Sequence, residues 1–88
     1  MPNIKQQKKR MRTAAEARLR NRQVKSSIRT LFRNLQVSVD EQDRETAEAV
    51  VAQLTARIDK AAARGVLHKN NAAHKKSRVA RIFAGLSA

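Results

Sequence analysis

Hydrophobic positions between about Glu16 and Val39 recur at helical spacing and predict the helix around which the chain is organised. One arc of this helix carries the apolar side chains Ala17, Val24, Ile28, Leu31, Phe32, Leu35 and Val39. A neighbouring arc carries the cations Arg18, Arg22, Lys25, Arg29 and Arg33. A third arc carries the short polar side chains Ser26, Ser27, Thr30 and Asn34. We therefore expect one helix that faces a small protein core on one side and a polyanion on the other.

A second helix is predicted after a cluster of acidic residues, which favour a helix N-terminus. Its apolar positions are spaced by three and four residues: Ala47, Val50, Val51, Leu54, Ile58 and Ala61. Ser38 with Glu41 has capping-box spacing, and Asp43 is an equally good N-cap, so the sequence leaves both starts open. Gly65 follows the last periodic position and is expected to end the helix.

A third helix is predicted after a short connection over residues 66–68, with Asn70 or Asn71 as its N-cap. Its apolar positions are Ala72, Ala73, Val79, Ala80, Ile82, Phe83 and Leu86. No stretch alternates as a strand would. The expected fold is all-α: a single domain over residues 1–88, built as an antiparallel three-helix bundle with a long, overhanging first helix.

Residues 1–17 form a basic extension of the first helix that has few apolar anchors. Its crowded cations oppose helix formation at spacings of three and four residues; they are Lys5, Lys8, Lys9, Arg10 and Arg12. We expect this segment to be loose in the free protein and helical once phosphates screen it. Its Arg-rich character also suits a mitochondrial transit peptide, but it continues without a break into the core-forming helix.

The charge balance narrows the class of partner. Twenty Lys and Arg against seven acids give a net charge of +13. The charge is +10 over residues 1–38, −3 over 39–60 and +6 over 61–88, so the first and third helices are the expected binding elements. Only nineteen residues are Leu, Ile, Val or Phe, so the core is thin and a neutralising partner is expected. Nucleic acid is the first candidate and an anionic membrane surface the second.

Several classes of functional site need residues that this chain lacks. The chain has no Cys, and His68 and His74 are six positions apart with no acid nearby, so we expect no metal site and no cofactor. No glycine-rich loop, nucleophile elbow or carboxylate pair points to an enzyme or to a small-molecule substrate. Trp and Tyr are absent, and no stretch is long and apolar enough to span a membrane or act as a secretory signal. Recognition of nucleic-acid shape and backbone is therefore favoured over stacking on aromatic platforms.

Two parts of the sequence contain distinctive motifs. The first comprises Met1–Lys5, Lys8–Arg10, Arg18–Arg22 and Lys25–Ser27; the second comprises Asp59–Ala62, Gly65–Val66, His68–Asn70, Ala72–Ala73 and Lys75–Arg78. Both parts resemble the bacterial ribosomal small-subunit protein number twenty family. The resemblance covers nearly the whole chain, although His74 stands where a basic residue is expected. It implies a cytoplasmic, non-catalytic constituent of the small ribosomal subunit that binds small-subunit ribosomal RNA directly during assembly. It further implies a bridge between the 5′ domain and the long penultimate helix, with few protein contacts and no membrane contact.

The expected RNA-binding residues come from the basic faces and from this resemblance. By analogy with the family, Asn21 and the Lys25–Ser27 step contact RNA from the first helix. The complete expected set is Lys5, Lys8, Lys9, Arg10, Arg12, Arg18, Asn21, Arg22, Lys25, Ser26, Ser27, Arg29, Arg33, His68, Lys69, Asn70, Lys75, Lys76, Ser77, Arg78 and Arg81. The alternative interpretation of the same charge pattern is a DNA-compacting basic protein without sequence specificity.

Overall fold

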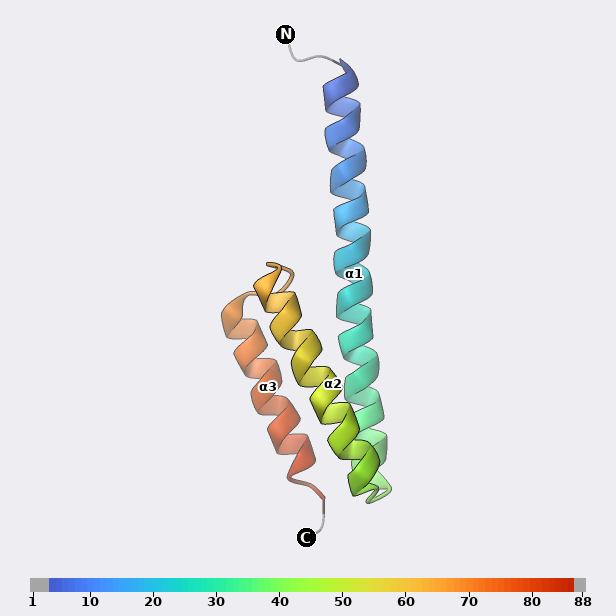
Figure 1. The fold of residues 1–88 in the computed structure, drawn as a ribbon, viewed down its shortest axis with the longest axis vertical. Helices are drawn as coiled ribbons and strands as arrows, with labels where there is room; N and C mark the ends of the chain where they lie inside the picture. The colour runs from blue at the N-terminus through green and yellow to red at the C-terminus, as the bar shows by residue number, and fades with distance from the viewer. Residues whose placement is uncertain (1–3, 87–88) are drawn as a thin grey trace.

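Three α-helices make up the fold. The computed structural model describes the backbone of residues 4–86 and the side chains of residues 8–86. The helices are α1 (Ile4–Asp40), α2 (Arg44–Ala63) and α3 (Lys69–Phe83), and residues 4–86 contain no strand. α2 runs antiparallel to α1, and α3 turns back along the side of α2 (Figure 1). The predicted all-α three-helix fold is confirmed.

The first helix is much longer than its partners. Its 37 residues span about 55 Å, whereas the 20 residues of α2 span about 30 Å. The N-terminal part of α1 therefore projects beyond the other two helices (Figure 1). Residues 8–16 are all exposed, and Ala17 is the first half-buried position. The overhanging first helix is confirmed, while the looseness of residues 1–17 in the absence of RNA stays a prediction.

The core is a single cluster to which all three helices contribute. Its buried members are Ile28, Leu31, Phe32, Leu35, Val39, Ala47, Val50, Leu54, Ile58, Ala61, Leu67, Ala72, Val79 and Leu86. Val24 and Val51 pack against this cluster with partial burial. The apolar stripes predicted for the first two helices are therefore confirmed.

The stripe predicted for the third helix was partly wrong. Ala73 and Ala80 are exposed, whereas the preceding residues, Ala72 and Val79, are buried. Successive helical side chains are about 100° apart, so only one of two neighbouring residues faces the core. The connection before α3 also supplies a core residue, because Leu67 is only 4% exposed.

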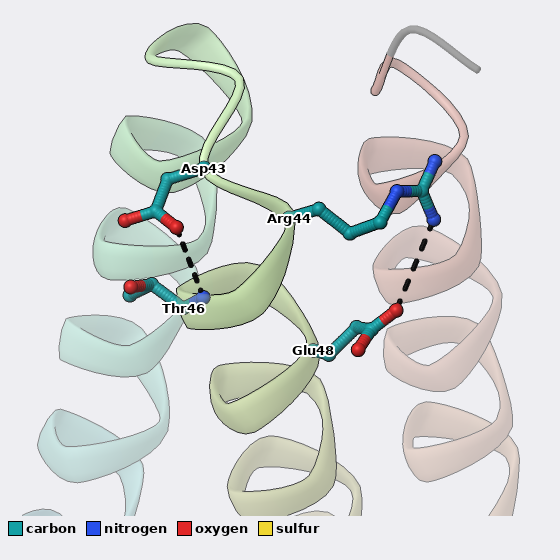
Figure 2. A network of polar contacts seen from close by, with 4 residues as sticks. All are labelled: Asp43, Arg44, Thr46 and Glu48. Carbon is teal, nitrogen blue, oxygen red and sulfur yellow. Dashed lines mark hydrogen bonds and ion pairs between the residues drawn. The ribbon is translucent and has the colours of Figure 1, made fainter.

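The turn between α1 and α2 uses Asp43 as the cap. Its carboxylate accepts a 3.2 Å hydrogen bond from the backbone N–H of Thr46 (Figure 2). This bond and the side-chain hydrogen bond with Thr46 lower the pKa of the Asp43 carboxyl. Ser38, the other candidate cap, is a buried member of α1 whose Oγ donates to the Asn34 carbonyl. Of the two starts left open by the sequence, the structure has the one at Asp43.

The turn between α2 and α3 confirms Gly65 and corrects the third cap. Gly65 has a φ of +76°, and its N–H donates to the Ala62 carbonyl while the Val66 N–H donates to that of Ala61. These two bonds form a Schellman motif, which requires the left-handed backbone that glycine adopts most readily. The N-cap of α3 is His68 rather than Asn70 or Asn71. Its Nδ1 accepts the Asn70 N–H at 3.1 Å and so satisfies a donor of the first turn.

Polar side chains also hold the helices together in pairs. Arg57 of α2 donates to the Ser27 hydroxyl of α1 at 2.5 Å. Lys76 of α3 lies 2.9 Å from the Asp59 carboxylate of α2. Two cation–π contacts add to these: the Arg78 guanidinium lies over the Phe32 ring, and that of Arg44 over the Phe83 ring. Arg44 also lies 3.9 Å from Glu48 (Figure 2).

Candidate nucleic-acid interface

A groove of about 490 Å³ lies between α1 and α3. Its lining contains no acid and no residue of α2; the members are Lys25, Ile28, Arg29, Phe32, Arg33, Gln36, Leu67, Asn71, Lys75, Arg78 and Ile82. Three of these, Ile28, Phe32 and Leu67, are buried core residues that form an apolar floor. The groove therefore has an apolar floor and cationic walls.

Helical periodicity explains why the walls of this groove are basic. On α1, Lys25, Arg29 and Arg33 are spaced by four residues and form a row along one side of the helix. They stand beside Ile28 and Phe32, which face the core, so the same part of the helix surface holds both kinds of side chain. The basic row predicted next to the apolar stripe is thus what lines the α1 side of the groove.

The third helix supplies the opposite wall with the same spacing. Asn71, Lys75, Arg78 and Ile82 follow one another at steps of three and four residues and so lie on one face of α3. Lys75 is half-buried, while Asn71 and Arg78 are exposed. Since α1 and α3 run in the same direction, their two rows of hydrogen-bond donors lie parallel on opposite sides of the groove.

The cations of the groove have no acidic partner among the described residues. The ion pairs of residues 8–86 join Arg44 to Glu48 and Lys76 to Asp59, and all four of these residues lie outside the groove. The five lining cations are Lys25, Arg29, Arg33, Lys75 and Arg78. Positive charge gathered around a low-dielectric floor concentrates anions, so the groove is suited to bind a polyanion.

A second basic surface covers the overhang of α1. The expected contact residues Lys8, Lys9, Arg10, Arg12, Arg18, Asn21 and Arg22 are all exposed there. Lys9 and Arg10 flank a shallow hollow that is otherwise lined by the small residues Thr13, Ala14 and Ala17. Small side chains let a helix approach a ligand closely, so cations beside them can reach phosphates. The side chain of Lys5 falls outside the described residues.

Four of the expected contact residues have a partner within the protein. Ser27 is half-buried and accepts from Arg57, and Lys76 pairs with Asp59. His68 caps α3 through Nδ1, so Nε2 is the ring nitrogen left for another contact. Arg78 lies over Phe32 but remains exposed. The side chains of Lys69, Asn70, Ser77 and Arg81 are exposed without such a tie, and Lys75 is half-buried in the groove.

Two groove residues were missed as contact candidates from the sequence. Asn71 was considered only as a helix cap, although it stands four residues before Lys75 on the same helical face. Gln36 continues the α1 row beyond Phe32, and its amide donates to the Asp40 carboxylate at 2.9 Å. The signal in the sequence was the spacing of four residues, which joins Gln36 to Phe32 on α1 and Asn71 to Lys75 on α3.

Other kinds of site are not formed by the part of the chain that the structure describes. No group of three or more His, Asp or Glu within it could hold a metal ion. None of its helices combines the length and the apolar character needed to cross a bilayer. The basic groove and the basic overhang are the prominent surfaces of the described residues.

Comparison with known proteins identifies the relatives of this chain. Residues 2–84 match the family model of ribosomal protein S20. The chain is 49% identical over 80 residues to the small ribosomal subunit protein bS20 of Mycobacteroides abscessus, an alignment that covers 91% of this chain and 93% of that protein. The protein of the same name from Arthrobacter sp. is 46% identical over 81 residues, covering 92% of this chain and 94% of its own. That from Kineococcus radiotolerans is 46% identical over 84 residues, covering 96% and 98%.

Proposed function

This chain belongs to the ribosomal protein S20 family, and we propose that it binds small-subunit ribosomal RNA directly through the α1–α3 groove and the α1 overhang. Its relatives are named as proteins of the small ribosomal subunit, so its role is that of a structural constituent of the ribosome and not of an enzyme. In this role the protein works as a fixed set of cations that holds folded RNA segments together.

The observation that carries this proposal is the unpaired positive charge of the groove. Its five cations have no acid among the described residues to neutralise them, and the acids of α2 lie outside its lining. Cations that neutralise phosphates release the counterions condensed on the RNA to solution, which favours binding. Arg29, Arg33 and Arg78 can each grip two phosphate oxygens, whereas Lys25 and Lys75 act as point charges.

The shape of the molecule supports a bridging role. The groove lies between α1 and α3, where the helices pack together. The N-terminal part of α1 projects past the other two helices (Figure 1). From the helix lengths this overhang is about 25 Å, and its exposed cations form a separate basic surface. One RNA segment can fill the groove while another lies along the overhang. By resemblance to the family, these segments are the 5′ domain and the long penultimate helix of small-subunit RNA. A protein that binds both would hold them together during assembly.

Hydroxyl-radical footprinting of the protein on small-subunit ribosomal RNA tests the bridge. The expected result is protection in both the 5′ domain and the long penultimate helix. A variant with Lys8, Lys9 and Arg10 changed to Gln should lose protection in one segment only. A variant with Arg29 and Lys75 changed to Gln should lose protection in the other. Protection confined to one segment in the unmodified protein would contradict bridging.

A further inference from the structure

We propose that the α1–α3 groove takes one unpaired nucleotide of the RNA, with its base stacked on the Arg78 guanidinium and its phosphate between Arg29 and Lys75. This inference rests on the proposed function, because it names the part of the RNA that the groove recognises. It differs from backbone binding alone, since a duplex presents its phosphates but keeps its bases stacked inside.

The first observation is the contact that links the two walls of the groove. The guanidinium carbon of Arg78 lies 4.8 Å from the centre of the Phe32 ring. A guanidinium is planar and has two faces, and the ring occupies one of them. Arg78 is exposed, so it remains open to a ligand. The ring restrains the guanidinium, so less side-chain entropy is lost when a base stacks on it.

The second observation is the apolar floor. Ile28, Phe32 and Leu67 line the groove between the cations, and the half-buried Ile82 joins them from α3. A phosphodiester gains nothing from contact with such a floor, because its charged oxygens would lose water there. The flat face of a base does gain, because it removes apolar surface from water. An apolar floor between cations therefore matches a nucleotide better than a phosphate alone.

The third observation is the placement of polar groups around that floor. Arg29 of α1 and Lys75 of α3 both line the groove, so a phosphate in it can be held from both helices. Asn71, one turn before Lys75 on α3, adds an amide that can both donate to and accept from the edge of a base. A groove of about 490 Å³ has the size of sites that hold small organic ligands. The groove is therefore lined by groups that can hold a phosphate, stack on a base and contact the edge of that base.

The test compares three RNA duplexes that differ at one position. One is fully paired, one carries a single bulged adenosine, and one carries an abasic bulge at the same place. The abasic bulge retains the distortion and flexibility of the backbone but lacks the base. We expect the full-length protein to bind the adenosine bulge about tenfold more tightly than the abasic bulge, which is within the range of one base-stacking contact.

Variants then assign the effect to the groove. Arg78→Lys keeps the charge but removes the planar stacking surface, so it should abolish most of the preference for the adenosine bulge while the salt dependence of binding is unchanged. Arg64→Lys makes the same exchange at an exposed position that lies outside the groove and outside the expected RNA-binding set, and it should keep the preference. Phe32→Leu, checked for retained helicity by circular dichroism, should reduce the preference as well.

The outcomes separate this inference from the proposed function. Equal affinity for the adenosine bulge and the abasic bulge would overturn the nucleotide site, while strong binding of both would leave RNA binding in place. An unchanged preference in Arg78→Lys would also overturn the site. Failure to bind small-subunit ribosomal RNA at all would overturn the proposed function itself.

Discussion

Arg57 Nη1 on α2 donates a 2.5 Å hydrogen bond to Ser27 Oγ on α1, thirty residues earlier in the chain. Ser27 belongs to the short polar arc of the first helix and, by resemblance to the family, to the expected RNA contacts. The bond fixes the hydroxyl toward α2, so Ser27 helps to hold the helices in register. The helix that faces RNA is thus also positioned by polar side chains within the protein.

A double-mutant cycle measures this contact. Ser27→Ala and Arg57→Ala should each destabilise the fold, and their coupling energy should be about 0.5–1 kcal/mol, as for a hydrogen bond at a partly exposed site. Urea denaturation of the two single variants and the double variant supplies the coupling. Additive effects would show that the bond contributes nothing to the packing of α1 on α2.

The local patterns on α1 and α2 were sufficient to predict most of the fold. The stripes from Val24 to Val39 and from Ala47 to Ala61 have a clear period, and burial follows it. The start of α3 was harder to predict, because His68 is not among the common capping residues. The burial of Leu67 was also hard to predict, because Leu67 lies in a turn, where residues do not follow the spacing of a helix.

Contacts between distant parts of the chain could not be predicted from local patterns. Lys76 has a basic context in the sequence, yet it pairs with Asp59, seventeen positions earlier. The sequence identifies Phe32 as a core residue and Arg78 as a surface cation. Only the packing of α3 beside α1 brings the two together. The basic faces were therefore predictable, whereas the groove between them was not.

Gly65 has a left-handed backbone conformation that disfavours a side chain. Gly65→Ala should destabilise the protein by about 1–2 kcal/mol, because its φ of +76° is unfavourable for a side chain with a Cβ. The site itself is open, with no atom within 4 Å of an added Cβ, so the cost comes from the backbone alone. Gly65→Asn is the matched control and should cost less, since Asn tolerates this conformation better. Equal losses for both variants in thermal denaturation would count against this explanation.

Asp43 makes stability depend on pH. Its folded-state pKa is lowered by the Thr46 hydrogen bonds, so the carboxylate stabilises the fold above its unfolded pKa of about 4. That contribution is lost as the pH falls through the lower, folded-state pKa. Asp43→Asn keeps a capping side chain without a charge, so its melting temperature should lie below that of the unmodified protein at pH 7 and approach it under acidic conditions. A constant difference between the two proteins across this range would exclude the carboxylate as the cause.

Core and surface positions should separate stability from binding. Leu54 is fully buried, so Leu54→Ala should cost about 2–5 kcal/mol of folding free energy.

Arg22 is exposed on α1 beyond the groove, so Arg22→Ala should leave the melting temperature unchanged and reduce the salt slope of RNA binding by about one unit. Titrations at several salt concentrations, paired with thermal melts, test both. If Arg22→Ala melts the protein and Leu54→Ala does not, the assignment of the two faces is reversed.

Direct competition between nucleic acids tests the central claim that this surface recognises ribosomal RNA. Labelled small-subunit ribosomal RNA bound to the protein at physiological salt is challenged with unlabelled RNA of the same sequence or with duplex DNA of the same length. The account predicts that the RNA competes orders of magnitude more strongly than the DNA. Equal competition by both would contradict it, and would favour a basic protein that compacts DNA without specificity.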